Sequence, residues 1–453
     1  MTTETTPNIT RNEPAEPDTP SGAFVPQPKS IEDTGLELSL LVDLALKSIH
    51  FSGRPTGRQL SEHLTLAFPV IEELVAFLRQ EQALEVVGTA GVGEQAYQYA
   101  LTKRGTEKAE EALGRNQYVG PAPVPLSLYT DVLQHQSVRD VHIDRQTFLD
   151  GVSHLVLSRN VLAALGPAAN TGRSVLIYGN SGNGKSSLAL AIAGMLPGAV
   201  LIPYAVEVHG QIIKVFDPRM HEPAKPQVAE ERRQAIASPP AGQERRQDRR
   251  WVVAKRPTVR VGGELTLQDL ELRYSELSKF YIAPLQWKAN SGVLIIDDFG
   301  RQLVQPRELL NRWIVPMEQG VDRLSLHTGD TLDLPFEVLL IFSTNIPPAK
   351  LGDEAFFRRI RHKVEVPNPT REEYLSILTR VCEEQGVAHT EEGAGYLVEA
   401  YYDQTDREFK GCHPRDLVEL LIDITNFYGE EPELTPEWVD LACSSYFVEA
   451  EAA

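Results

Sequence analysis

The feature that most constrains the fold is a glycine-rich octapeptide at residues 179–186, which reads Gly-Asn-Ser-Gly-Asn-Gly-Lys-Ser. It follows a short apolar run at residues 175–178 and precedes a segment of helical spacing at residues 187–196. Glycines let successive backbone N–H groups curve around a phosphate without obstruction by Cβ atoms, and a helix N-terminus adds partial positive charge. The pattern G-x-x-x-x-G-K-[ST] between a strand and a helix therefore predicts a site for the phosphate chain of a nucleotide.

The two side chains at the end of this motif are expected to bind the phosphate oxygens and the metal ion. Lys185 is predicted to neutralise the β- and γ-phosphate oxygens, and the Ser186 hydroxyl to bind Mg²⁺. The complete predicted nucleotide-binding set is Gly179, Asn180, Ser181, Gly182, Asn183, Gly184, Lys185, Ser186 and Ser187.

A second apolar run, residues 292–296, ends in the acidic pair Asp297 and Asp298. In an open α/β sheet, ligands bind at the carboxyl ends of the strands, which is where these two acids are expected. Asp297 is predicted to hold Mg²⁺, mostly through water. Asp298 is predicted to orient or deprotonate the water that attacks the terminal phosphate.

Three later segments resemble motifs of the AAA+ ATPase family. The run Leu-Leu-Ile-Phe-Ser-Thr-Asn at 339–345 resembles the core strand that ends in a polar sensor, and the resemblance places Asn345 between the two earlier motifs. Residues 355–360 resemble the segment that carries the arginine finger, and residues 412–417 resemble the second sensor. Together with the phosphate loop, the resemblance covers about residues 151–446.

The resemblance assigns roles to three arginine positions. It implies that Arg359 is the arginine finger, with Arg358 as the alternative, and that Arg415 opens a lid helix and links it to the nucleotide state. The sequence departs from the family at Asp298, where a glutamate is usual. Because Asp is one methylene shorter, the attacking water must be positioned slightly differently, so this difference is expected to bear on the hydrolysis rate and not on nucleotide binding.

The fold implied is a P-loop NTPase parallel sheet of the AAA+ type with a C-terminal helical lid. The N-terminal part has three helical segments, a hairpin and a closing helix, which resemble a winged-helix domain. Three prolines at 121, 123 and 125 indicate a stiff linker after it. The predicted segments are a disordered tail (1–30), a winged-helix-like domain (31–115), a linker (116–150), an α/β core with a mobile insertion near 216–260 (151–366) and a helical lid (367–453).

Composition limits the partners and the compartment. There are 44 Lys and Arg residues against 63 Asp and Glu residues, a net charge of −19, so the whole chain is a poor general binder of DNA or anionic membrane. The stretch 232–260 is locally basic, with nine Lys or Arg residues and two acids. No apolar leader or long apolar span is evident, and the three cysteines are scattered. These features predict a cytoplasmic protein with no membrane segment.

The resemblance implies an ATP-binding and ATP-hydrolysing AAA+ remodelling ATPase with Mg²⁺, assembled as a ring and expected to be a hexamer. It would act on an unidentified protein partner or on nucleic acid. The alternative is a DNA-associated regulator or loader that uses ATP as a conformational switch. A small-molecule kinase would use the same phosphate loop, but no acceptor pocket is evident in the sequence.

Overall fold

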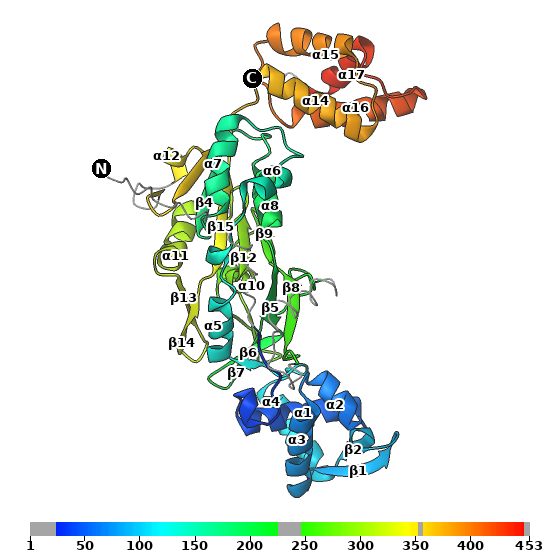
Figure 1. The fold of residues 1–453 in the computed structure, drawn as a ribbon, viewed down its shortest axis with the longest axis vertical. Helices are drawn as coiled ribbons and strands as arrows, with labels where there is room; N and C mark the ends of the chain where they lie inside the picture. Colours follow the sequence, from blue (N-terminus) through cyan, green and yellow to red (C-terminus); the bar gives the residue numbers. More distant parts are fainter. Residues whose placement is uncertain (1–23, 225–245, 352–356, 448–453) are drawn as a thin grey trace, which may run out of the picture.

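The computed structural model describes residues 24–224, 246–351 and 357–447. Figure 1 shows an elongated molecule with a small N-terminal domain at one end, an α/β core in the middle and a C-terminal helical domain at the other end. Most of the tail predicted at 1–30 and the middle of the insertion predicted near 216–260 lie outside the described residues. Among the described helices, none is long and apolar enough to cross a membrane.

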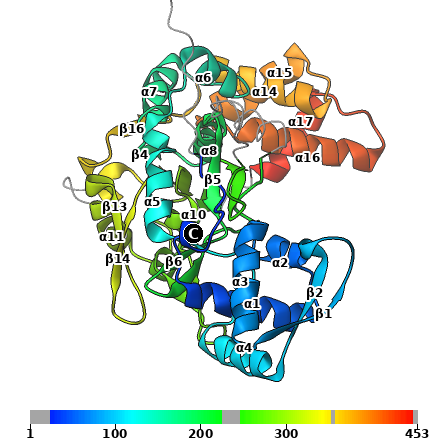
Figure 2. The ribbon, with the colours of Figure 1, turned by 60° about the horizontal axis from the view of Figure 1, so that its bottom comes forward.

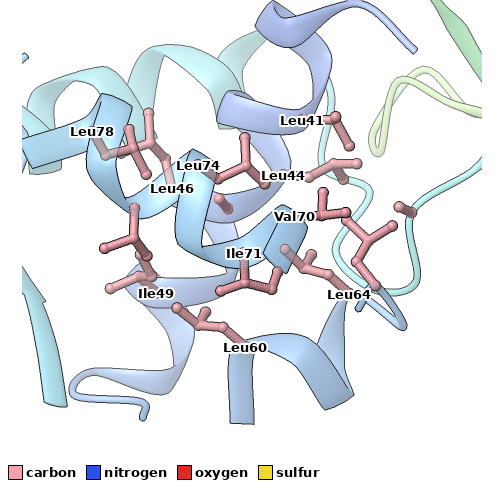
Figure 3. Packing of buried hydrophobic residues seen from close by; sticks show 14 of the residues in the cluster. Leu41, Leu44, Leu46, Ile49, Leu60, Leu64, Val70, Ile71, Leu74 and Leu78 are labelled. Carbon is pink, nitrogen blue, oxygen red and sulfur yellow. The ribbon is translucent and has the colours of Figure 1, made fainter. Parts of the chain in front are cut away.

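The N-terminal domain has three helices, a two-stranded antiparallel hairpin and a closing helix. Figure 2 shows the hairpin projecting from the helices at the edge of the molecule. The core is formed by leucine, isoleucine and valine side chains on the inward faces of the first three helices, as Figure 3 shows. The elements are α1 (Leu38–Ser52), α2 (Gly57–His63), α3 (Phe68–Gln80), β1 (Leu84–Thr89), β2 (Tyr97–Leu101) and α4 (Lys103–Arg115).

A buried lysine lies inside this domain and makes its stability depend on pH. Lys47 is 2% exposed, and its ammonium donates to the carbonyl of Asn116 at 3.0 Å. Burial lowers the pKa of Lys47 from 10.5 to about 8, a shift that the charge of Asp43 partly opposes. Between these two values the unfolded chain binds more protons than the folded one, so stability rises with pH in that window.

Replacing this lysine tests the linkage. The wild-type chain is expected to gain stability between pH 8 and 10.5, up to about 3 kcal/mol from this group, and a Lys47→Met variant is expected to lack that gain. The measurement is urea-induced unfolding followed by circular dichroism at several pH values. Because other groups titrate equally in both proteins, the wild-type minus variant difference isolates Lys47, and a constant difference would contradict the prediction.

The stretch 116–150 differs from the linker expected there, because it is folded into the core. It contains β3 (Val124–Pro125), α5 (Leu126–Gln134) and α6 (Arg145–Gly151), and its apolar residues are buried. The prolines do not prevent this. Strand β3 is the edge strand of its sheet, where a missing N–H is tolerated, and Pro125 directly precedes the first residue of α5, a position that suits its fixed φ.

The centre of the core is an all-parallel sheet in the order β16-β4-β15-β12-β9. Its three inner strands, β4, β15 and β12, are almost completely buried, as expected for parallel strands covered by helices, whereas the edge strands β16 and β9 are partly exposed. Two of its covering helices are α7 (Arg159–Ala169) and α8 (Lys185–Met195). The strands are β4 (Ser174–Tyr178), β9 (Thr258–Val261), β12 (Gly292–Ile296), β15 (Val338–Thr344) and β16 (His362–Glu365).

A second, mixed sheet lies between this core and the N-terminal domain. It runs β10-β11-β7-β6-β3 and packs with the separate pair β5–β8 and the hairpin β13–β14 in one apolar cluster. The strands β5 to β11 all lie between Lys185 and Asp297 and lengthen that interval. The elements are β5 (Ala199–Pro203), β6 (Ala205–Val208), β7 (Gln211–Lys214), β8 (Trp251–Lys255), β10 (Arg273–Tyr274), β11 (Tyr281–Ile282), β13 (Val321–Ser325) and β14 (Thr331–Pro335).

The prediction of a mobile insertion reaching to residue 260 is therefore wrong for its last part, where β8 and β9 form. Several of the basic residues there are structural. Arg250 is 1% exposed, pairs with buried Asp248 and donates to the carbonyls of Thr34 and Pro123. Arg256 donates to three backbone carbonyls. These arginines satisfy buried carbonyl groups, so they are not a solvated basic loop.

The C-terminal helical domain follows β16 and has an apolar core of its own. Buried Tyr402 bonds both Tyr374 and His413, at 2.8 Å each, and burial lowers the pKa of His413 to about 4, so this histidine is neutral. The network fixes the start of α16 against the rest of the domain. The helices are α14 (Arg371–Gln385), α15 (Glu391–Val398), α16 (His413–Tyr428) and α17 (Pro436–Tyr446), with a π-helical turn at Glu399–Asp403.

Candidate nucleotide-binding site

The order of three neighbouring strands brings the sequence motifs together. Strand β15 lies between β4, which leads into the phosphate loop, and β12, which leads into Asp297 and Asp298. All three are parallel, with Thr344 opposite Tyr178 and Ile296 opposite Phe342. Asn345, directly after β15, therefore lies at the same sheet edge as the two other motifs.

Two of the loop glycines are required by close approaches as well as by their positive φ angles. At Gly179, φ is +146° and a Cβ would lie 2.1 Å from the carbonyl oxygen of Val366. At Gly182, φ is +84° and a Cβ would lie 2.4 Å from the Cys412 sulfur. The loop is thus packed against the backbone after β16 and against the C-terminal helical domain.

Oxygen groups suited to Mg²⁺ meet where the loop faces strand β12. The Ser186 hydroxyl donates to Asp297 Oδ1 at 2.8 Å. Burial alone would raise the pKa of Asp297, but hydrogen bonds from Ser186, Ser343 and Arg260 outweigh it and lower the pKa below the usual value. An ionised carboxylate beside a hydroxyl is a donor set that fits Mg²⁺, which prefers oxygen ligands.

The second acid and the predicted sensor are also in contact. Asn345 Nδ2 donates to Asp298 Oδ1 at 3.1 Å. Asp298 has a φ of +48°, a left-handed conformation that is uncommon for a residue other than glycine and that turns the chain sharply after β12. Strain of this kind is frequent at functional sites, and here it accompanies a carboxylate that accepts a hydrogen bond from the Asn345 amide.

Lys185 lies within the loop that it closes. Its ammonium donates to the carbonyl of Asn180 at 2.7 Å, and the residue is 6% exposed. Burial lowers the pKa of Lys185, while the charges of Asp298 and Asp297 act in the opposite direction. A cation held inside the loop and near two carboxylates is placed to receive phosphate oxygens.

Lys185, Ser186, Asp298 and Asn345 line one cavity of about 460 Å³. The loop residues 181–187, Asp298 and Asn345 form its polar side, and Arg415 from α16 reaches it from the C-terminal helical domain. Its other walls are mixed, because His154, Arg380 and Glu384 lie there beside apolar side chains that suit a flat base. They come from the segment before α7 and from α14, and include Leu155, Val156, Leu157, Ile377 and Val381.

The fold follows from the position of β15 between the phosphate-loop strand and the acidic strand, and from the helical domain that contacts the loop. The core has the AAA+ fold.

Comparisons with known proteins found one family model and distantly similar structures. Residues 370–445 match a family model described as a domain of unknown function, DUF8689. No curated protein matches the chain. The RuvB Holliday junction branch migration motor of Thermotoga maritima is 14% identical with a TM-score of 0.35, over 69% of this chain and 72% of that one. NtrX of Brucella abortus is 16% identical with a TM-score of 0.40, over 77% of this chain and 64% of that one. We base the fold on the strand order and the phosphate loop.

The AAA+ core also contacts its helical domain through side chains of the phosphate loop. Asn180 and Asn183 both donate to Asn368 Oδ1, at 3.1 and 2.8 Å, and Asn368 in turn donates to Glu408. The backbone N–H of Gly411 donates to Asn183 Oδ1 at 3.2 Å. A change in the conformation of the loop would therefore alter hydrogen bonds to the segment that leads into α16.

The two arginines near the predicted finger position have different surroundings. Arg359 is largely buried, and its Nε donates to Glu318 Oε1 on α11 (Pro306–Gln319) at 2.5 Å. Arg358 is exposed. Neither lines the cavity formed by this chain, as expected if one of them acts at the site of a neighbouring protomer. Part of the predicted segment, residues 355 and 356, lies outside the described residues.

Two polar residues at the site were not predicted. Asn368 follows β16 in a Pro-rich stretch that gives no pattern. Arg260 was counted with the basic insertion, yet it occupies β9 and pairs with Asp297. The signal that could have identified it is the run Thr-Val-Arg-Val at 258–261, in which a single arginine interrupts β-branched residues as on an edge strand.

Proposed function

We propose that this protein binds ATP with Mg²⁺ and hydrolyses it to remodel a protein or nucleic-acid partner. The observation that carries the proposal is that the Asn345–Asp298 and Ser186–Asp297 hydrogen bonds meet beside a single cavity. Lys185 and Arg415 also line that cavity. Phosphate binding, metal binding, activation of water and a link to a helical domain are thus combined within one site.

Each of the chain's groups has a distinct task in this proposal. Backbone N–H groups of residues 179–187 and the Lys185 ammonium would bind the phosphates. Ser186 and Asp297 would hold Mg²⁺, which supplies positive charge to the β- and γ-phosphates when bound. Asp298 would accept a proton from the attacking water or orient it, with its carboxylate held by the Asn345 amide.

We further propose that the protein works as a ring, with a hexamer as the expected size, in the cytoplasm. Arg359 would enter the site of the neighbouring protomer and stabilise charge on the terminal phosphate. Arg415, at the start of α16, would couple the helical domain to the nucleotide state. The position of Arg415 in the cavity wall supports this role.

The charges on the N-terminal domain favour a protein partner over DNA. The exposed face of α3, which would enter the groove in a winged-helix domain, carries Glu72 and Glu73. A hydrogen bond with Glu94 and the charge of that residue raise the pKa of Glu72, so acidic groups gather here. Such a surface repels phosphates. The DNA-associated alternative requires binding of duplex DNA that weakens steeply with salt, and no binding at low salt would eliminate it.

The direct test is binding of a fluorescent ATP analogue with and without Mg²⁺, followed by phosphate release from ATP. Wild type is expected to bind and to hydrolyse, and Lys185→Ala to lose binding while remaining folded by circular dichroism. Arg323→Ala, which removes an exposed ion pair on the β13–β14 hairpin, is the matched control. Absence of nucleotide binding by wild type in the presence of Mg²⁺ would overturn the proposal.

A further inference from the structure

We propose that Arg260 is a positioning residue that holds Asp297 in place of the metal and releases it when Mg²⁺ and nucleotide bind. The inference rests on the proposed function, since it concerns the same site. It adds a cation from the chain itself to the metal-binding pair of Ser186 and Asp297.

The hydrogen bonds at Asp297 account for both of its carboxylate oxygens. The Ser186 hydroxyl and the Asp298 backbone N–H donate to Oδ1, at 2.8 and 3.1 Å. Arg260 donates to Oδ2 through Nε at 3.1 Å and through Nη2 at 2.5 Å. Within the described part of the chain, Arg260 is thus the only cationic side chain that donates to this carboxylate, and it covers the oxygen that Ser186 leaves open.

The sheet register explains why this arginine reaches the site. Strand β9 runs parallel to β12 with Arg260 opposite Ile295, and the N–H of Asp297 donates to the carbonyl of Val261. Val259 and Val261 are buried while Arg260 alternates outward, so its side chain runs along the sheet edge toward Asp297. The position of the guanidinium is therefore set by backbone pairing.

Arg260 and Asp297 differ in solvent exposure in a way that would let Mg²⁺ replace the arginine on the carboxylate. The Asp297 side chain is 9% exposed, whereas that of Arg260 is 50% exposed. A buried carboxylate is costly without a cationic or hydrogen-bonding partner, so it stays where it is. A half-exposed arginine can turn its head group into water at little cost, and a bound metal would then supply the positive charge that the carboxylate needs. The arginine can leave, and the carboxylate remains aligned for a metal.

Loss of Arg260 should have opposite effects on the affinity for metal-free nucleotide and on the affinity for Mg²⁺. Without Mg²⁺, Arg260 offsets the charge of Asp297 and reduces its repulsion of the phosphates. With Mg²⁺, Arg260 competes with the metal for Oδ2. Removing the arginine should therefore weaken metal-free nucleotide binding and, at the same time, lower the Mg²⁺ concentration needed to restore it.

The experiment compares wild type, Arg260→Gln and Arg260→Lys by titrating a fluorescent ATP analogue in EDTA and at increasing Mg²⁺. For Arg260→Gln we expect metal-free affinity to fall about threefold to tenfold, and the half-saturating Mg²⁺ concentration to fall by a similar factor. Arg260→Lys keeps the charge and loses the two-nitrogen contact, so it should shift less in the same directions. Arg323→Gln, at another exposed ion pair, should match wild type.

The outcomes separate this inference from the proposed function. If wild type binds nucleotide with Mg²⁺ and Arg260→Gln shows the same two affinities, the inference alone is wrong. If both affinities of Arg260→Gln fall together, Arg260 binds nucleotide directly and does not exchange with the metal. If wild type binds no nucleotide, the proposed function is wrong and this inference falls with it. Should Arg260→Gln fail to fold, the Arg260→Lys titration decides, because a wild-type result there contradicts the inference.

Discussion

An Asp298→Asn variant is expected to bind ATP as tightly as wild type and to lose at least about a hundredfold of its turnover, in keeping with the usual contribution of a general base. The side chain keeps its size and an oxygen that can accept from Asn345. It loses the negative charge and the basicity needed to activate water. Binding depends on the phosphate loop, Ser186 and Asp297, which the substitution leaves unchanged.

The measurement is the rate of phosphate release at saturating ATP, together with the affinity for a fluorescent ATP analogue. Asp330→Asn, in the exposed turn of the β13–β14 hairpin, is a control for loss of one aspartate. Turnover at the wild-type rate in Asp298→Asn would remove Asp298 from the mechanism. Loss of binding as well as turnover would mean that Asp298 contributes to the binding site itself.

The parts of the site that could be predicted from sequence are those where a local pattern fixes the geometry. The strand run at 292–296 is β12, and the octapeptide at 179–186 does connect a strand to a helix. The meeting of Asn345 with Asp298 followed from the parallel arrangement, since neighbouring strands bring their carboxyl ends to one edge. In each case a short segment contains the whole signal.

The parts that could not be predicted depend on long-range pairing. Strand β9 is four residues long and is stabilised by β12, which begins more than thirty residues later. Its arginine looks like part of a charged loop until the pairing with Asp297 is known. In the same way, the prolines near Pro125 suggest a linker, although a sheet edge and a helix start accept them. Local composition alone does not distinguish these cases.

The second sheet also changes what the β13–β14 hairpin can do. The apolar residues of this hairpin are buried in the cluster formed with that sheet. At its turn, His327 stacks on Tyr274, and its backbone N–H donates to the Tyr281 hydroxyl. Motion of the hairpin would therefore move the second sheet, which also contacts the N-terminal domain. The hairpin is better placed to transmit motion than to grip a substrate.

An Arg359→Ala variant is expected to keep its affinity for ATP and to lose about a thousandfold of its turnover in the assembled state, the usual size of an arginine-finger effect. The reason is that the guanidinium would stabilise the transition state in the neighbouring protomer's site. In this chain the Arg359 Nε donates to Glu318 Oε1 on α11, which holds the side chain in place. Arg358→Ala is the matched variant, because Arg358 is adjacent and exposed.

Mixing Lys185→Ala and Arg359→Ala protomers tests whether the site is shared between neighbours. Lys185→Ala protomers cannot bind nucleotide but still present Arg359, while Arg359→Ala protomers bind nucleotide but present no finger. If the site is shared, each variant alone is inactive and their mixture recovers part of the activity. Recovery with Arg358→Ala and not with Arg359→Ala would transfer the role to Arg358. An Arg359→Ala monomer that hydrolyses ATP at the wild-type rate would contradict the shared site, because turnover would then need neither a neighbouring protomer nor Arg359.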